Sequence, residues 1–371
     1  MTSNARVLVA IACSLALFGC GTADQPDRRA ETVRIFNWSD YIASDTLANF
    51  TAQTGLRTVY DVFDSQEVLE ARLLSGATGY DVVVPSSDAI ARHIQAGVFQ
   101  PIQRELLSNY GNLDPDLLRF LRTVDPDNTY AVPYLWGTTG IGYNVAMVEA
   151  RFPEGAPVDS LDLLFKPENI ERLADCGVAM LDSGAEVFPV VLNYLGLDPN
   201  STDAADYQGP LRDAFLAIRP HIRYFHSSQY INDLANGEIC VVLGWSGDIL
   251  QAADRAEEAG RGVEIEYAVP EEGTSVWFDL LAIPRDAGNV AGAHAFIDFL
   301  LRPEVIAEIT NEVYYANPNI PATELIEEEI RDDPGIYPPS EVRARLFAAE
   351  ARSPELDRVM TRVWTEIKTG R

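Results

Sequence analysis

Short apolar runs alternate with amphipathic helical patterns along most of this chain. The expected strands are residues 33–36, 56–63 and 80–85, and the expected helices are residues 42–54, 65–75 and 89–96. Apolar runs of this length are typical of buried strands, and apolar side chains three or four positions apart indicate helices. Because strands that alternate with helices form a mostly parallel sheet, the pattern predicts an α/β fold.

A second α/β unit is expected from about residue 145 to residue 256. Its clearest strands are residues 177–182 and 239–245; strands at 263–269 and 275–283 come next, and helices are expected at 291–301 and after Pro339. Between the two units, residues 131–144 combine strand-forming side chains with glycines, which is typical of a crossover between domains. The length of 371 residues also favours two domains, at roughly 150 residues each.

The first 20 residues have the composition of an export signal. Arg6 precedes an apolar stretch over residues 7–18 that is too short to span a bilayer. The sequence LFGC at residues 17–20 resembles a bacterial lipobox, although Phe18 stands where a small residue is usual. We therefore expect residues 1–20 to be a lipoprotein signal peptide that ends at a lipidated Cys20, with residues 21–30 as a polar tether.

The chain is strongly acidic, and this excludes some classes of partner. The formal net charge is -28 and the isoelectric point is about 4.4. Nucleic acids and anionic lipid surfaces are poor partners for such a surface, whereas cationic solutes are attracted to it. The charge also has a simpler interpretation, because an acidic surface helps to keep an exported protein soluble.

Two cysteines remain outside the expected signal peptide. In an oxidising compartment, Cys176 and Cys240 would most simply form one disulfide within a domain. Their wide spacing argues against a zinc site or a CxxC redox site. We expect no metal and no cofactor.

Three clusters place an aromatic ring close to an aspartate at the end of an expected strand. They are Trp38 with Asp40, Trp245 with Asp248, and Trp277 with Asp279. Each cluster alone has a structural interpretation, namely a core tryptophan followed by an aspartate that begins a turn or a helix. Open α/β sheets bind ligands in the loops at the carboxyl ends of their strands. If the fold brings these three strand ends together, the three clusters are expected to line one crevice.

Such a crevice suits an organic dication. Carboxylates compensate ammonium groups that lose their hydration, and aromatic faces attract cations while they cover the methylenes. Sugar clefts are also lined with tryptophan and aspartate, so a carbohydrate-active enzyme is an alternative. The chain contains no GxSxG, HExxH or P-loop motif, and we do not expect an enzyme.

Four long runs resemble the polyamine-binding periplasmic proteins of bacterial polyamine ABC transporters, within the extracellular solute-binding protein family. The runs are NWSDY at residues 37–41, YDVFDS at 60–65, TGIGYN at 139–144 and RYFHSSQYINDLANG at 223–237. The resemblance implies a two-lobed, type II-like periplasmic-binding-protein fold, with ligand in the cleft between the lobes. It also implies the Cys176–Cys240 disulfide and these ligand-binding positions: Trp38, Ser39, Asp40, Tyr41, Ser86, Glu186, Trp245, Asp248, Trp277, Asp279 and Tyr315.

Two positions near the implied pocket depart from the family pattern. Trp277 stands where the putrescine receptor has a smaller aromatic residue, and Asp88 replaces a serine at the rim. A larger ring and an added carboxylate would favour a longer amine such as spermidine. Putrescine remains the first choice because the other positions match, and Asp88 is added to the expected ligand-binding set.

The resemblance also implies an organisation and a role. The first lobe would contain residues 31–136 and 257–303, and the second residues 137–256 and 304–371. The protein would be a periplasmic monomer that captures putrescine or a related polyamine and delivers it to the membrane permease. The lipobox departs from the family pattern and adds the expectation of a lipid anchor. A spermidine-preferring receptor and a lipoprotein that senses polyamines are the alternatives.

Overall fold

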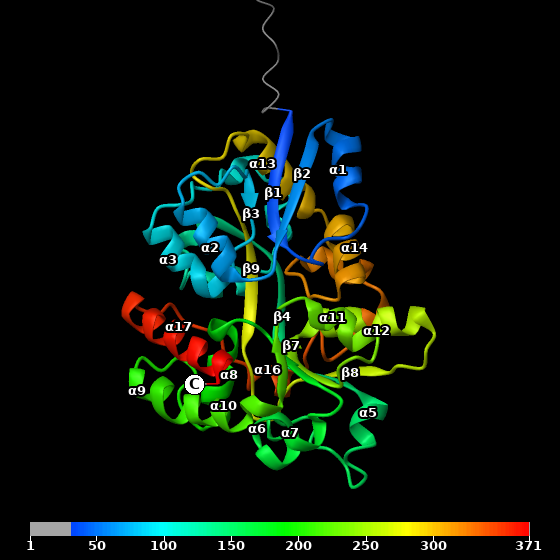
Figure 1. Ribbon diagram of the computed structural model, residues 1–371. Helices are drawn as coiled ribbons and strands as arrows, with labels where there is room; N and C mark the ends of the chain where they lie inside the picture. The colour runs from blue at the N-terminus through cyan, green and yellow to red at the C-terminus, as the bar shows by residue number, and fades with distance from the viewer. Residues whose placement is uncertain (1–30, 371) are drawn as a thin grey trace, which may run out of the picture.

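The computed structural model describes residues 31–370 (Figure 1). The strands are β1 (Thr32–Trp38), β2 (Arg57–Phe63), β3 (Val82–Val83), β4 (Ala131–Asn144), β5 (Val178–Met180), β6 (Ile222–Phe225), β7 (Val241–Trp245), β8 (Ile265–Ala268) and β9 (Val276–Ala282). The α-helices are α1 (Thr46–Thr54), α2 (Gln66–Leu74), α3 (Ser87–Gln95), α4 (Pro115–Leu121), α5 (Val145–Glu149), α6 (Asp162–Phe165), α7 (Pro167–Leu173), α8 (Gly184–Tyr194), α9 (Ala204–Asp206), α10 (Arg212–Ile218), α11 (Gln229–Ala235), α12 (Ser246–Ala259), α13 (Val290–Leu300), α14 (Pro303–Val313), α15 (Glu328–Arg331), α16 (Ser340–Arg343) and α17 (Pro354–Thr369).

The short helical turns η1 to η6 complete the list. They are η1 (Arg104–Leu106), η2 (Tyr110–Asn112), η3 (Pro126–Asn128), η4 (Tyr207–Leu211), η5 (Arg219–His221) and η6 (Ile320–Leu325). Helix α1 begins later than the expected residue 42. The backbone N–H of Thr46 donates to the carbonyl oxygen of Ala43 at 3.2 Å, so a turn precedes the helix.

The strands form one continuous sheet with the order β2-β1-β3-β9-β4-β7-β5-β6, and β8 pairs with β4. The outer pairs β1–β2, β1–β3, β5–β6 and β5–β7 are parallel. The pairs that contain β4 or β9 are antiparallel. The expectation of mostly parallel sheets therefore holds for the outer strands and is wrong for the centre, because β4 and β9 run between the two halves in opposite directions (Figure 1).

The long strand β4 connects the two halves, as expected for a crossover at residues 131–144. Its first part, from Ala131 to Thr138, pairs with β9. Its second part, from Thr139 to Tyr143, pairs with β7. The strand thus belongs to both halves, and the ends of β7 and β9 meet beside its middle.

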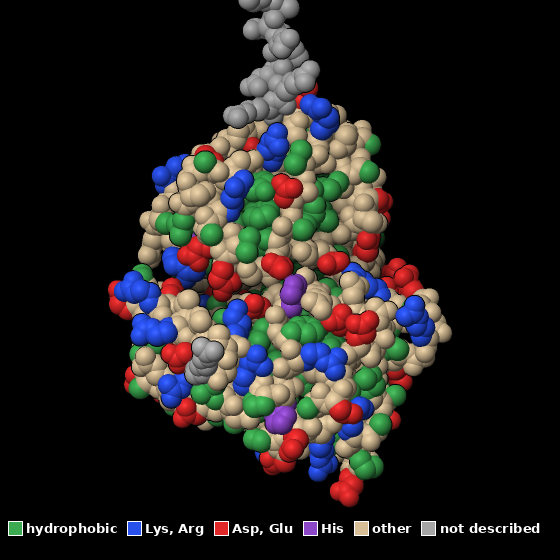
Figure 2. Space-filling model, in the orientation of Figure 1, with side chains coloured by type: hydrophobic (Ala, Val, Ile, Leu, Met, Phe, Trp, Pro, Cys, Tyr) green, Lys and Arg blue, Asp and Glu red, His purple; other side chains and the backbone are tan. Residues whose placement is uncertain are grey.

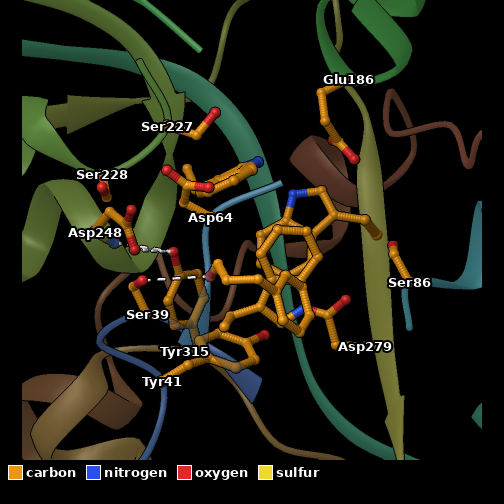
Figure 3. A pocket seen from close by; sticks show the side chains of 14 residues that line it. Ser39, Tyr41, Asp64, Ser86, Glu186, Ser227, Ser228, Asp248, Asp279 and Tyr315 are labelled. Carbon is orange, nitrogen blue, oxygen red and sulfur yellow. Dashed lines mark hydrogen bonds between the residues drawn. The ribbon is translucent and has the colours of Figure 1, made fainter. Parts of the chain in front are cut away.

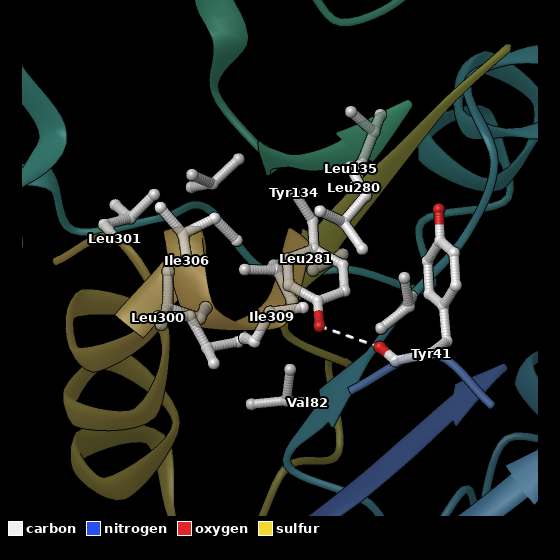
Figure 4. Close-up of a cluster of buried hydrophobic side chains, with 14 of the residues drawn as sticks. Tyr41, Val82, Tyr134, Leu135, Leu280, Leu281, Leu300, Leu301, Ile306 and Ile309 are labelled. Atoms are coloured by element: carbon white, nitrogen blue, oxygen red, sulfur yellow. Dashed lines mark hydrogen bonds between the residues drawn. The ribbon is translucent and has the colours of Figure 1, made fainter. Parts of the chain in front are cut away.

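Two hydrophobic cores lie on either side of this crossing. The first includes Val82, Tyr134 and Leu281 beside buried side chains of α13 and α14 (Figure 4). Within it, the hydroxyl group of Tyr134 donates to the carbonyl oxygen of Tyr41 at 2.8 Å. The second core packs α8, α10 and α17 around β5 and β7. Two separate cores with a shared sheet are what a two-lobed α/β protein requires.

The cores divide the chain differently from the expected lobe boundaries. Residues 304–338 were placed in the second lobe by the resemblance, yet the buried side chains from Val305 to Ile336 pack in the first core. Only the last helix, from Leu356 to Ile367, packs in the second core. Similarly, Ile265 packs in the second core although 257–303 was expected in the first lobe. We propose boundaries that follow these cores, because apolar packing decides which lobe a segment moves with.

The expected disulfide between Cys176 and Cys240 is present, with 5.5 Å between the Cα atoms. It connects the segment before β5 to the segment before β7. Within residues 31–370, no helix is both long and apolar enough to cross a membrane. The expected signal peptide, Cys20 and the tether 21–30 lie outside the described residues.

Candidate functional site

A cavity with about 420 Å³ of empty space lies between the two lobes where β7 and β9 meet β4. Its walls come from both lobes (Figure 3). The lining residues are Trp38, Ser39, Tyr41, Phe63, Asp64, Ser86, Glu186, Ser227, Ser228, Trp245, Asp248, Trp277, Asp279 and Tyr315. Ten of these are among the twelve expected ligand-binding residues. The tryptophans of all three clusters converge, together with the aspartates of the second and third clusters.

Strand ends supply most of the walls. Trp38 and Phe63 are the last residues of the parallel strands β1 and β2 and lie opposite each other in the register. Trp245 ends β7, and Ser227 follows β6 by two residues. Because parallel strands end at the same edge of a sheet, residues distant in sequence reach one crevice there.

Strand β9 contributes through its alternation rather than through its end. Side chains two positions apart point to the same face of a strand, so Trp277 and Asp279 both line the cavity. Phe278, between them, points away from it. Its ring packs 5.3 Å from the ring of Phe120 and 6.2 Å from that of Trp136. The spacing of one residue between aromatic and acid is therefore what places both in the site.

The aromatic rings form a continuous wall. Trp245 lies 5.5 Å from Trp38 and 6.4 Å from Trp277, and Tyr315 lies 5.4 Å from Trp277 and 4.9 Å from Tyr41, measured between ring centroids. These separations and the steep interplanar angles are typical of edge-to-face packing. The wall presents ring faces and edges to a narrow space, which suits an apolar chain that carries positive charge.

Asp248 is held in place by two tyrosines. Tyr315 donates its hydroxyl to one carboxyl oxygen at 2.6 Å, and Tyr230 donates to the other at 2.7 Å. Burial raises the pKa of Asp248 to about 7, although both hydroxyl donors act in the opposite direction. Gly247 allows this arrangement, because a Cβ atom there would lie 2.5 Å from the ring of Tyr315.

The other acidic groups are more crowded than Asp248. Asp279 is only 4% exposed, and one of its carboxyl oxygens has no hydrogen-bond partner among the described residues. Burial raises its pKa well above the ordinary range, although the hydroxyl groups of Tyr41 and Ser86 act in the opposite direction. Burial also raises the pKa of Glu186 to about 8, and the nearby carboxylates of Asp88 and Asp279 add to this shift. Figure 3 shows Asp248 on one side of the aromatic rings and Glu186 and Asp279 on the other.

Two expected ligand-binding residues do not line the cavity. Asp40 lies in the turn after β1 with a φ of 52°, and its exposed carboxylate forms an ion pair with Arg255 at 2.7 Å. Asp88 lies in the first turn of α3 and pairs with Arg352 at 3.2 Å in a neighbouring cleft. In both cases the backbone turns after the strand and directs the side chain away from the cavity.

Four lining residues were absent from the expected set: Phe63, Asp64, Ser227 and Ser228. All four lie at or just after the ends of β2 and β6. Applied to the expected strand 56–63, the rule that identified Trp38 finds Phe63 and Asp64. It does not find Ser227 and Ser228, because the sequence pattern predicted no strand where β6 lies. Ser227 also accepts a hydrogen bond from the backbone N–H of Asp182 at 3.1 Å, which fixes its loop against β5.

The arrangement can bind a cation with two charged ends, because buried acids flank an aromatic passage. Within residues 31–370 no group of three or more His, Cys, Asp or Glu side chains has the arrangement needed to hold a metal ion. The unpaired carboxyl oxygen of Asp279 is a further indication of a positively charged ligand, because a buried carboxylate without a partner is costly.

Comparison with known proteins identifies the family. The family described as bacterial extracellular solute-binding protein matches residues 45–338. The putrescine-binding periplasmic protein PotF of Escherichia coli is 56% identical over 92% of each chain. The protein SpuD of Pseudomonas aeruginosa, also called putrescine-binding, is 51% identical over 97% of this chain and 98% of its own.

A solved structure agrees with the fold. A putative spermidine/putrescine ABC transporter protein from Listeria monocytogenes has a TM-score of 0.82 and 32% identity, and the match covers 92% of this chain and 100% of that one. The alternative of a carbohydrate-active enzyme is wrong, because the matching family consists of solute-binding proteins. The chain belongs to the bacterial extracellular solute-binding protein family and has the periplasmic-binding-protein fold.

Proposed function

We propose that this protein is the substrate-binding receptor of a polyamine ABC importer and that it binds putrescine or a closely related diamine. The observation that carries the proposal is the placement of Asp248 and Asp279 on two sides of one aromatic-walled cavity. The names of the relatives, several of which are called putrescine-binding, support the same ligand.

The chemistry of a diamine matches the walls of the cavity. One ammonium group would donate to Asp248, whose carboxylate is already oriented by Tyr230 and Tyr315. The other would donate to Asp279 and Glu186. The methylenes between them would lie against Trp245 and Trp277. Charge-assisted hydrogen bonds at both ends then fix the length of the ligand as well as its charge.

The wider role follows from the family and the sequence. We propose a periplasmic location, with Cys20 lipidated after removal of residues 1–20, and delivery of the amine to permease subunits in the inner membrane. Lobe closure would bury the amine, since the two walls of the cavity come from different lobes. Deletion of the gene should abolish putrescine uptake if the protein serves transport, whereas a sensing lipoprotein would leave uptake unchanged.

Isothermal titration of the purified protein with putrescine, cadaverine, spermidine and agmatine tests the ligand class. The proposal expects putrescine to bind most tightly of the four. Absence of binding by all four amines would contradict it. Glucose and maltose serve as controls and should give no heat of binding.

A further inference from the structure

A buried ion pair lies in the cleft next to the end of the cavity that contains Glu186. Asp88, in the first turn of α3, accepts a hydrogen bond from the guanidinium group of Arg352 at 3.2 Å. The two side chains are 8% and 10% exposed. Arg352 precedes α17, which lies just below α2 and α3 across the boundary between the lobes (Figure 1).

The pair is held by further charges on both sides. Arg352 lies 3.5 Å from Asp357, which in turn lies 3.5 Å from Arg92. Arg92 donates two hydrogen bonds to Glu70, at 2.9 and 3.0 Å. Figure 2 shows acidic and basic side chains gathered along the boundary between the upper and lower parts of the molecule. The guanidinium group of Arg352 is therefore held by one hydrogen bond to Asp88 and a longer ion pair with Asp357, while its Nε atom has no hydrogen-bond partner among the described residues.

This charged cleft is directly adjacent to the ligand cavity. Three separate segments pass from one wall to the other within one or two residues. Asp64, Ser86 and Glu186 line the ligand cavity, whereas their near neighbours Ser65, Asp88 and Ala185 line the cleft. The charges of Asp88 and Arg352 also act on Glu186, the first raising and the second lowering its pKa.

We propose that Arg352 is a specificity-determining residue: its guanidinium group, held by Asp88, occupies the place of a third ligand ammonium and so restricts the site to diamines. The inference rests on the proposed function and concerns the length of the amine. It also reverses the expectation that Asp88 favours spermidine, because the carboxylate of Asp88 is already compensated by a charge from the chain itself.

The guanidinium group of Arg352 and a third ligand ammonium would compete for the carboxylate of Asp88. A triamine that extends past Glu186 would bring its third ammonium against the guanidinium group, and like charges in a buried site repel strongly. Without Arg352, Asp88 would be a buried and uncompensated carboxylate, and one of its oxygens already lacks a hydrogen-bond partner among the described residues. A triamine would supply the positive charge that this carboxylate lacks, so its affinity should increase more than that of a diamine.

Titration calorimetry with putrescine and spermidine on the full chain and its variants tests this. The measured quantity is the spermidine Kd divided by the putrescine Kd. Arg352→Gln should lower this ratio by at least about tenfold, because Asp88 becomes available to the third ammonium. Arg352→Lys keeps the charge and should leave the ratio within about threefold of that of the unmodified protein.

Two further variants separate charge from space and from general surface effects. The double variant Asp88→Asn with Arg352→Gln opens the same space without a free carboxylate, and its ratio should stay close to that of the unmodified protein. Arg358→Gln is the matched control, since Arg358 is 66% exposed on α17 and its one ion pair within residues 31–370 is with Glu355. Arg352→Met replaces Arg352→Gln if the glutamine variant fails to fold in thermal unfolding.

Several outcomes would overturn the inference. If Arg352→Gln lowers the affinity for both amines by the same factor, Arg352 only stabilises the contact between the lobes. If the double variant gains spermidine affinity as strongly as the single one, space rather than charge sets the limit. Failure of the unmodified protein to bind either amine would instead overturn the proposed function, and it is distinguished because it does not depend on any variant.

Discussion

Asp248 and Asp279 are both 4% exposed, yet their carboxyl groups have different surroundings. Asp248 accepts hydrogen bonds from Tyr230 and Tyr315, one on each oxygen. Asp279 has an oxygen without a partner among the described residues and lies within electrostatic reach of Asp88 and Glu186. Hydroxyl groups of the chain orient the carboxyl group at one end of the cavity, and a ligand cation would relieve the crowding at the other end.

The difference matters for how closure is controlled. Crowded carboxylates that are unpaired in a closed cavity disfavour closure without a cation. Tyr230 packs in the same core as the start of α12, so it orients Asp248 whichever way the lobes lie, whereas Tyr315 packs in the first core and joins it only when the lobes are together. Asp248 can therefore form the first contact with the ligand. We therefore expect Asp248 to orient the ligand. We expect the acidic groups around Asp279 to make closure of the lobes depend on the ligand.

The largest expected effect is at Asp248. Asp248→Asn removes the carboxylate oriented by the two tyrosines, and we expect putrescine affinity to fall by at least about 100-fold, on the order of 3 kcal/mol. Asp279→Asn should cost less, about 10-fold to 30-fold, because Glu186 remains and mutual repulsion is relieved. Calorimetry on both variants measures the difference. Equal losses, or a larger loss at Asp279, would contradict the comparison.

The pH dependence of affinity tests the crowded end. Burial raises the pKa of Glu186 to about 8 and that of Asp248 to about 7, and it raises the pKa of Asp279 well above the ordinary range. A bound ammonium favours the ionised carboxylates, so binding releases protons and affinity falls as the pH decreases. Between pH 8 and pH 5.5 we expect a loss of at least about tenfold, since alkyl ammonium groups stay protonated throughout.

Glu186→Gln sharpens this measurement. With one of the raised carboxyl groups removed, fewer protons should be released on binding and the pH profile should become shallower, while Asp248 and Asp279 continue to titrate. Titrations in buffers of different ionisation enthalpy count the released protons. An affinity that does not change with pH, or a profile that the substitution leaves in place, would show that the acids are already ionised in the empty protein.

A smaller effect is expected from the tyrosine that supports Asp248 without lining the cavity. Tyr230→Phe removes one hydroxyl donor, and we expect putrescine affinity to fall about fivefold, near 1 kcal/mol. The matched control is Tyr207→Phe, because the buried hydroxyl of Tyr207 donates to the carbonyl oxygen of Ser201 in the second core. That control should lower thermal stability and leave affinity unchanged; an equal affinity loss in both variants would remove the supporting role of Tyr230.

The smallest effect is expected at Asp40. Its carboxylate is 38% exposed and pairs with Arg255, and exposed pairs contribute about 0.2–1 kcal/mol. Asp40→Asn should therefore change putrescine affinity by less than about fivefold, in line with Arg255→Gln. A loss as large as that of Asp248→Asn would show that Asp40 contacts the ligand after all.

Strand periodicity predicted the tryptophans and two of the aspartates of the site, and the resemblance supplied Ser39, Tyr41, Ser86, Glu186 and Tyr315. Trp277 and Asp279 share a face of β9 by alternation, and Trp38 and Trp245 end their strands. The prediction fails for a residue that lies beyond a strand end. Asp40 follows Trp38 by two positions, but a left-handed turn directs its carboxylate to Arg255, and no local pattern encodes that partner more than 200 positions away.

The fold, too, was predictable only where it depends on local sequence patterns. Alternating patterns predicted the α/β class and the crossover at β4, because both depend on local spacing. The antiparallel centre and the return of residues 304–338 to the first core depend on contacts between distant segments, such as Val305 and Ile336 with the sheet of the first lobe. The support of Asp248 by Tyr230 and the pairing of Asp88 with Arg352 are contacts of the same kind.

A crystal structure of the protein with putrescine bound tests the central claim most directly. We expect one ammonium nitrogen within about 2.7–2.9 Å of an Asp248 carboxyl oxygen and the other at a similar distance from Asp279 or Glu186, with the methylenes against Trp245 and Trp277. A ligand that contacts only one of these ends, or that lies outside the cavity, would contradict the account.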